Sequence, residues 1–170
     1  METPDTVLVE QCRGGNTAAF GELLQRHQDA VFNLLMKLTG NWHEAADLTQ
    51  EAFIRAYRKL DAYDPQFCFK NWVITIGVHL ARNRFRSLFR RLRTEEQTPG
   101  PETVTRVDPR IEEVNQALAQ LPVKLRLPLV LKHMEGYSYE EVAQTLGIGV
   151  SAAKMRVLRA RTELVRRLES

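Results

Sequence analysis

Apolar residues recur at every third or fourth position along most of the chain, which is the spacing of helices that bury one face. In the first half this spacing is interrupted after Gly40 and again around Pro65, and asparagines stand where helices can begin. The pattern predicts a short helix before Arg13 and three longer ones over residues 17–39, 42–60 and 70–93.

The second half continues the helical spacing. Helices are predicted to begin after residue 110 and after Pro122, the second with Pro128 inside it and a bend expected there. A third helix begins at Ser138, which has Glu141 at the spacing of a capping box. Ser151 is predicted to cap the last helix.

No stretch alternates apolar and polar residues for long enough to predict a β-strand, so the predicted fold class is all-α. Between the helical halves, residues 94–110 contain prolines, glycine and acidic residues without apolar periodicity. We therefore predict two small helical domains, residues 1–93 and residues 111–170, joined by a flexible acidic linker.

Charge divides the chain into alternating acidic and basic blocks. The net charge is −4 over residues 1–64, +7 over 65–94, −4 over 95–113 and +4 over 114–170. Two basic surfaces of this kind suit a polyanion such as nucleic acid. With 170 residues, 44% of them hydrophobic, the chain can bury a core beneath these surfaces.

The sequence lacks the residue patterns of an enzyme or a metal site. Cys12 and Cys68 are the only cysteines and the four histidines are scattered, so neither a zinc site nor a disulfide framework is predicted. No nucleophile with a base and no phosphate-binding glycine loop is recognisable, so we expect no enzymatic activity, cofactor or small-molecule substrate. Without a signal peptide or an apolar run near the ~20 residues of a membrane span, we expect a cytoplasmic protein without direct membrane insertion.

The segment from Ser138 to Leu168 has the pattern of a helix-turn-helix, whose second helix enters the major groove of DNA. The last helix carries six lysines and arginines, with Glu163 among them. The alternative is a basic helix that is simply solvated at the end of a bundle. Groove insertion is favoured because the basic residues follow a turn of the right length.

Arginines and aromatic residues adjoin late in the first domain. Arg82, Arg84 and Arg86 lie in a stretch from residue 65 to 94 that contains no acid. Aromatic rings can stack on unpaired bases, and cationic side chains can bind the phosphate backbone. The combination suits single-stranded nucleic acid.

Among the rings of this segment, two lie in a predicted loop and two in a predicted helix. Tyr63 and Phe67, in the loop, are expected to be available to bases. Phe69 and Trp72 lie at helical spacing, which more often places a ring in the core. His79 lies one turn ahead of the arginines and is expected to touch DNA.

Motifs in both halves resemble those of bacterial sigma factors of the extracytoplasmic-function group, the compact type with sigma regions 2 and 4. The likeness to region 2 lies in residues 46–57, 69–73 and 81–83. The likeness to region 4 lies in residues 121–122, 135–143 and 159–161. In this family the first motif docks on core RNA polymerase, the rest of region 2 melts and reads the −10 element, and region 4 binds the −35 element.

The resemblance implies a sigma factor that binds core RNA polymerase and directs it to promoter DNA for transcription initiation. The residues implied for core polymerase share a helix face away from the buried stripe: Asp47, Gln50, Glu51 and Arg55. Those implied for the −10 element, where the loop would hold a flipped base, are Tyr63, Phe67, Trp72, His79, Arg82, Asn83 and Arg86. Those implied for the −35 element are Ser138, Tyr139, Lys154, Met155, Arg156, Leu158, Arg159 and Arg161.

The resemblance further implies an anti-sigma factor as a partner and an acidic linker that imitates a transcript. His79 stands where the family often has asparagine, and residues 151–156 depart from a frequent family sequence, so no relative's promoter sequence transfers to this chain. Two alternatives compete with this interpretation. A repressor or activator without polymerase leaves the motif at residues 47–57 unexplained, and a helical protein-interaction domain would carry its basic faces only for solubility.

Overall fold

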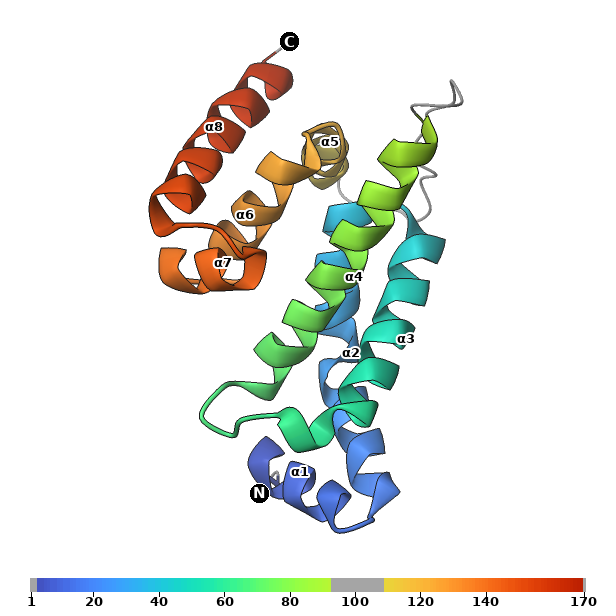
Figure 1. The fold of residues 1–170 in the computed structure, drawn as a ribbon. Helices are drawn as coiled ribbons and strands as arrows, with labels where there is room; N and C mark the ends of the chain where they lie inside the picture. Colours follow the sequence, from blue (N-terminus) through green and yellow to red (C-terminus); the bar gives the residue numbers. More distant parts are fainter. Residues whose placement is uncertain (1–2, 93–108, 170) are drawn as a thin grey trace.

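The computed structural model describes residues 3–92 and 109–169, with side chains described outside residues 86–92 and 109–112. All regular structure in these residues is helical (Figure 1). The helices are α1 (Asp5–Arg13), α2 (Thr17–Thr39), α3 (Trp42–Arg58), the short 3₁₀ helix η1 (Leu60–Ala62), α4 (Phe69–Leu92), α5 (Pro109–Ala119), α6 (Val123–His133), α7 (Tyr139–Leu146) and α8 (Val150–Leu168). The all-α prediction is confirmed, and the predicted linker lies almost entirely outside the described residues.

The ends of the helices in the first unit are set by local side-chain bonds, as the sequence predicts. The side chain of Asn16 accepts a hydrogen bond from the Ala18 amide at 3.1 Å, and the side chain of Asn41 accepts one from the Glu44 amide at 2.9 Å. Gly40 ends α2 in the left-handed conformation, with φ 69°, which a glycine adopts without steric cost.

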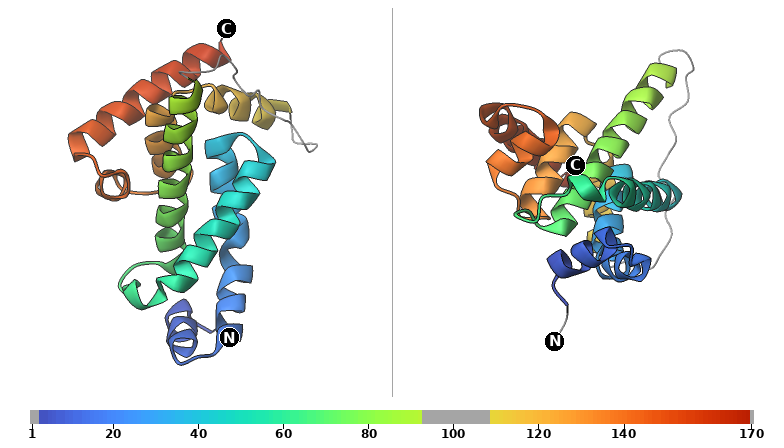
Figure 2. Two further views of the ribbon diagram at one scale, coloured as in Figure 1. Left: turned by 45° about the vertical axis from the view of Figure 1, so that its right-hand side comes forward. Right: turned by 60° about the horizontal axis from the view of Figure 1, so that its bottom comes forward.

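Helices α2, α3 and α4 lie side by side, and α1 covers one end of them (Figures 1 and 2). Leu35 of α2 is fully buried at the centre of this bundle. A Cβ atom added to Gly77 of α4 would lie 3.3 Å from Leu35 Cδ1, so the glycine lets the two helices approach closely.

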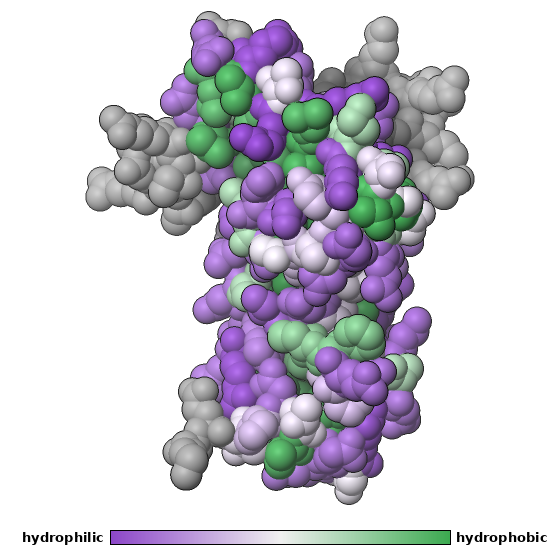
Figure 3. Space-filling model, turned by 90° about the vertical axis from the view of Figure 1, so that its left-hand side faces the viewer, coloured by the Kyte–Doolittle hydropathy of each residue, from purple (hydrophilic) through white to green (hydrophobic). Residues whose placement is uncertain are grey.

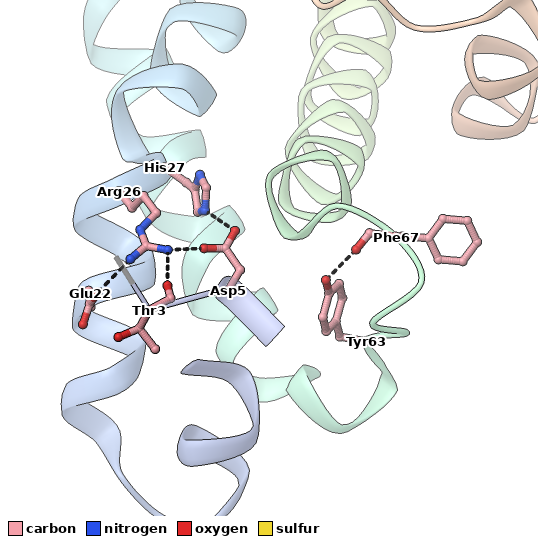
Figure 4. A network of polar contacts seen from close by, with 7 residues as sticks. All are labelled: Thr3, Asp5, Glu22, Arg26, His27, Tyr63 and Phe67. Carbon is pink, nitrogen blue, oxygen red and sulfur yellow. Dashed lines mark hydrogen bonds and ion pairs between the residues drawn. The ribbon is translucent and has the colours of Figure 1, made fainter. Parts of the chain in front are cut away.

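Helix α1 is fixed to α2 by a partly buried polar network (Figure 4). Arg26 Nη1 donates to Asp5 Oδ1 at 2.6 Å and to the Thr3 carbonyl at 2.8 Å. His27 Nε2 lies 2.7 Å from the second oxygen of Asp5. The network therefore fixes the position of α1 on α2.

The second unit confirms the predicted capping box and corrects one predicted cap. Ser138 Oγ accepts from the Glu141 amide at 3.1 Å, while the Glu141 carboxylate accepts from the Ser138 amide at 2.7 Å. Ser151 does not cap α8: the N-cap is Gly149, whose carbonyl accepts from the Ala153 amide at 3.0 Å. The turn at Gly147 ends early enough for α8 to begin at Val150, one residue before the serine.

The two helical units share one hydrophobic core across their boundary. Leu127, Val130 and Leu131 of α6 belong to the same buried cluster as Leu35 of α2. Helix α5 lies on α2, α6 lies on α2 and α4, and α7 lies on α4 (Figures 1 and 2). The second unit therefore packs directly on the first through this shared core.

Candidate functional site

The exposed face of α3 carries the side chains implied for polymerase binding. Asp47, Gln50 and Arg55 are exposed, and Glu51 is half-buried and pairs with Arg55 along the helix. Leu48 and other residues of the opposite stripe are buried in the core. Capping at Asn41 and burial of the apolar stripe thus fix which polar side chains this helix presents to solvent.

Arg84 is exposed, and its guanidinium lies beside acidic side chains of α3. Its Nε lies 3.4 Å from Glu44 Oε1 and its Nη2 lies 4.0 Å from Asp47 Oδ2. The structure therefore places Arg84 with the acidic start of α3, apart from the arginines that the sequence groups for a nucleic-acid backbone.

Trp42 is an exposed aromatic residue that the sequence analysis missed. Its side chain remains 48% exposed although its ring packs edge-on against Phe32, with centroids 6.0 Å apart. Next to it, a groove of about 370 Å³ runs between α2 and α3, lined by Leu24, Gln28, Phe32, Trp42, Ala46, Thr49, Gln50 and Phe53. A tryptophan at the first position of a capped amphipathic helix is the sequence signal that could have found it.

Tyr63 is buried, so its predicted availability to a DNA base is wrong for this conformation. The side chain is 3% exposed and packs against Phe69 and Trp72, with ring centroids 5.5 and 5.2 Å away. Arg13 Nη2 donates to the Tyr63 carbonyl at 2.7 Å, which holds the residue in place from α1. Burial raises the pKa of the Tyr63 hydroxyl, which therefore remains a donor.

Phe67 is the exposed ring of the loop. The Tyr63 hydroxyl donates to the Phe67 carbonyl at 2.5 Å, and the Phe67 ring points away from Tyr63 (Figure 4). Phe67 is 58% exposed, Phe69 is buried, and Trp72 is half-buried. The loop thus presents one ring on a support of buried rings.

Two of the α4 residues implied for the −10 element, His79 and Arg82, lie one turn apart and contact the second unit. His79 Nε2 lies 2.7 Å from the Thr145 carbonyl, and Arg82 Nη1 donates to the Leu146 carbonyl at 2.7 Å. Asn83 is exposed. Arg86 lies within α4, but its side chain is outside the described residues.

Helix α8 presents the predicted reading face to solvent. Lys154, Met155, Leu158, Arg159 and Arg161 are exposed, and Arg156 is half-buried. Two of these, Met155 and Leu158, are large apolar side chains with 49% and 57% exposure. Figure 3 turns the side of the molecule that carries α7 and α8 toward the viewer, and hydrophobic side chains lie there among hydrophilic ones.

The start of α7 adjoins this reading face. Ser138 and Tyr139 are half-buried. The Tyr139 ring has Lys132 Nζ 4.8 Å and Lys154 Nζ 5.7 Å from its centroid, so it lies between two cations. Through the Tyr139 ring, the start of α7 therefore contacts Lys154 near the start of α8.

The described residues contain no group of three or more His, Cys, Asp or Glu side chains that could hold a metal ion. Cys12 is half-buried, Cys68 is exposed, and both are free thiols. No described helix is long and apolar enough to cross a membrane.

Comparisons with known proteins match both halves of the chain. The model of sigma-70 region 2 matches residues 23–91, and the model of sigma-70 region 4 matches residues 111–164. The chain is 35% identical over 155 residues to the ECF RNA polymerase sigma factor SigE of Mycolicibacterium smegmatis, covering 86% of this chain and 60% of that longer relative. It is 30% identical over 181 residues to the RNA polymerase sigma-H factor of Pseudomonas aeruginosa, covering 97% of this chain and 94% of that protein.

Among solved structures, CnrH in complex with the cytosolic domain of CnrY has a TM-score of 0.71 and 29% sequence identity, and the match covers 97% of each chain. Regions 2 and 4 occur here in the order and on the helices that the motifs predict. The chain belongs to the sigma-70 family, in the extracytoplasmic-function group of RNA polymerase sigma factors.

Proposed function

We propose that this sigma factor recruits core RNA polymerase to promoters through three separate surfaces, one each for polymerase, the −10 strand and the −35 duplex. The observation that carries the proposal is the exposed face of α8, where Arg159 lies beside Met155 and Leu158 after a capped turn. Such a face suits base edges in a major groove. Purified chain mixed with core polymerase should co-elute and start transcription, whereas a repressor or an adaptor domain should not.

Core polymerase is assigned to the exposed face of α3. Asp47, Gln50, Glu51 and Arg55 are its polar contacts, and we add Trp42 because it is exposed beside the groove that Gln50 lines. Tryptophan is enriched among the residues that dominate binding energy at protein interfaces.

Replacing Asp47 and Gln50 together by alanine should weaken core polymerase binding about tenfold, a typical cost for losing interface contacts. Both side chains are exposed, so the free energy of unfolding should change by less than about 0.5 kcal/mol for each. The matched control is the double variant Asp29→Ala with Gln25→Ala, which removes the same groups from the exposed side of α2. The affinities for core polymerase are measured by fluorescence anisotropy. Equal affinities of the two double variants would show that this face of α3 is not part of the polymerase interface.

The −10 strand is assigned to the loop and to the arginine face of α4. We propose that Phe67 stacks an unpaired base, since its ring is exposed and supported by buried rings. Tyr63 acts as a positioning residue through its bond to the Phe67 carbonyl. His79, Arg82, Asn83 and Arg86 hold the backbone of the unpaired strand.

Replacing Phe67 by alanine should reduce open complexes at least about fivefold, the lower end of what one lost stacking ring costs. Phe67→Trp keeps a ring and should retain most of the activity, and Tyr63→Phe should lose less than Phe67→Ala. Permanganate footprinting of the holoenzyme on duplex and pre-melted promoters measures the effect. If Phe67→Ala and Phe67→Trp behave alike on both templates, stacking is not the function of this ring.

The −35 duplex is assigned to α8 and the start of α7. Lys154, Met155, Leu158 and Arg159 are proposed to face base edges, and Arg156 and Arg161 to contact phosphates. Ser138 and Tyr139 are proposed to contact the backbone beside them. These roles separate sequence readout from general electrostatic attraction.

A protein inhibitor and a cytoplasmic location complete the proposal. CnrH, which resembles this chain over 97% of its length, is solved with the cytosolic domain of CnrY. We propose that this chain likewise binds an anti-sigma factor, and that it works in the cytoplasm, where its polymerase partner and promoters are. Co-purification from the native host would identify the inhibitor.

A further inference from the structure

Arg13, the last residue of α1, binds the backbone that leads into the loop of residues 63–68, the −10 loop. Its Nη2 donates to the Tyr63 carbonyl at 2.7 Å, to the Leu60 carbonyl at 3.0 Å and more weakly to the Asp61 carbonyl at 3.4 Å. The other arm, Nη1, donates to the Glu10 carboxylate at 2.6 Å. One guanidinium thus joins α1 to three carbonyls at the start of the −10 loop.

The carbonyls that Arg13 binds lie where the short helix η1 gives way to the loop. Carbonyls at the end of a helical turn lack intrahelical donors and need partners from elsewhere. A guanidinium has a rigid fork of five N–H donors, so it can bind the loop with one arm and Glu10 with the other. Arg13 therefore determines where the chain leaves η1.

Tyr63 passes this fixed position on to Phe67. The Tyr63 carbonyl accepts from Arg13, its side chain is 3% exposed, and its hydroxyl donates to the Phe67 carbonyl at 2.5 Å. Within the loop, the Asp64 carbonyl accepts from the Phe67 amide at 3.1 Å. The backbone that carries the Phe67 ring is thus held by hydrogen bonds on both its amide and its carbonyl.

Helix α1 is itself fixed, so that Arg13 acts on the loop from a firm base. At the other end of α1, Asp5 is paired with Arg26 of α2 (Figure 4). Between the two ends, Leu8 and Val9 are buried in the core. The helix is therefore attached to the first unit at both ends and along its apolar face.

A ring that is already held in place is a better platform for a base than a mobile one. Phe67 is 58% exposed, and a group that is ordered before binding loses less conformational freedom when its partner arrives. Helix α1 lies ahead of residues 23–91, which match sigma-70 region 2. The hydrogen bonds from Arg13 to the loop therefore come from outside the matched region.

We propose that Arg13 is a positioning residue for strand capture: it holds the −10 loop in the conformation in which the Phe67 ring receives an unpaired base. Helix α1 is then a working part of the −10 surface, acting through the loop. The inference rests on the proposed stacking role of Phe67.

Arg13→Ala should reduce open complexes of the holoenzyme about threefold on duplex and on pre-melted promoters. The loss is smaller than for Phe67→Ala, because the ring remains but is no longer held in place. Affinities for core polymerase and for −35 duplex should stay unchanged. Arg13→Lys should retain more activity than Arg13→Ala, since an ammonium group still donates to the loop carbonyls. Permanganate footprinting with core polymerase at a saturating concentration measures these losses.

The double variant Arg13→Ala with Phe67→Ala separates positioning from general stabilisation of the fold. If Arg13 acts through the ring, the double variant should lose no more than Phe67→Ala alone, about fivefold. Independent losses would multiply to about fifteenfold and would overturn the proposal.

Arg58→Ala is the matched control for charge. It removes an exposed arginine at the end of α3, just before η1 begins, and should equal wild type. A loss as large as that of Arg13→Ala would mean that Arg13 attracts the strand only by its charge, and the positioning role would be wrong.

If Arg13→Ala fails to fold, Arg13→Lys carries the same comparison. Its ammonium group cannot reproduce the fork of a guanidinium, so it should lose about twofold, and this loss should vanish in the Phe67→Ala background. If Phe67→Ala itself loses nothing, the proposed stacking role is wrong. If Phe67→Ala loses open complexes and the Arg13 variants equal wild type, only the positioning role is wrong.

Discussion

Replacing Arg159 by alanine should lower the affinity of the holoenzyme for its −35 duplex about fivefold to 150-fold, corresponding to about 1–3 kcal/mol for a lost base contact. Arg159 is exposed on the reading face of α8, one position after Leu158. An arginine at such a position donates two hydrogen bonds to a guanine edge, which no other base offers in the same geometry. The loss should therefore be greatest on the preferred sequence, and discrimination at one base pair should relax.

Arg166→Ala is the matched control, because it removes the same charge from the same helix. Arg166 donates two hydrogen bonds to Glu163, at 3.0 and 2.7 Å, and these bonds hold the pKa of Glu163 at about 2. Arg166 is thus engaged with Glu163, which also pairs with Arg167, and affinity should stay within about twofold of wild type, as surface pairs contribute little. Equal losses for both variants at fixed salt, on preferred and altered −35 sequences, would mean that Arg159 acts only by charge.

The parts of the fold that the sequence predicts are those determined over short distances. The cap at Asn16, the left-handed glycine at position 40 and the capping box at Ser138 each depend on residues within four positions. Helix periodicity and caps are local signals, and therefore the helix ends agree closely with the sequence analysis. The error at Ser151 also has a local cause, because α8 begins directly after the turn, with Gly149 as its N-cap.

Burial of Tyr63 could not be predicted because it depends on distant residues. Arg13 reaches the Tyr63 carbonyl from 50 positions away, and Asp5 fixes α1 through Arg26. The burial of this loop residue therefore depends on residues far away in the sequence, which the residues on either side of it do not reveal. The predicted exposure of Phe67, in the same loop, is confirmed, since its side chain is 58% exposed.

Contact between regions 2 and 4 escaped prediction for a related reason. Two helical halves joined by an acidic segment predict separate domains, because each half has its own apolar faces. Leu131 and Leu127 on α6 nevertheless bury themselves in the core that α2 and α4 begin. The sequence analysis assigned this face of α4 to nucleic acid. In the structure the carboxyl end of α7 contacts it through backbone carbonyls, which a count of charged residues does not include.

Replacing Leu35 by alanine should destabilise the protein by about 2–5 kcal/mol, the cost of deleting a fully buried leucine and leaving a cavity. Leu35 is 0% exposed and lies against Gly77, where α2 and α4 approach each other closely. Backbone on the α4 side cannot collapse into the space as readily as a side chain would, so a cost toward the upper part of this range is expected. Urea unfolding followed by circular dichroism at 222 nm measures the change in midpoint at constant slope.

Leu24→Ala serves as the control, because it makes the same deletion in the same helix at a half-buried position that lines the groove beside Trp42. It should cost about 1 kcal/mol, since only part of the side chain leaves water on folding. The ratio of the two losses reports how tightly α4 is packed on α2. If both variants lose equal stability, the close approach of α2 and α4 at Gly77 adds nothing to the stability of the core. In that case the packing at Gly77 would not be what holds α4 in position.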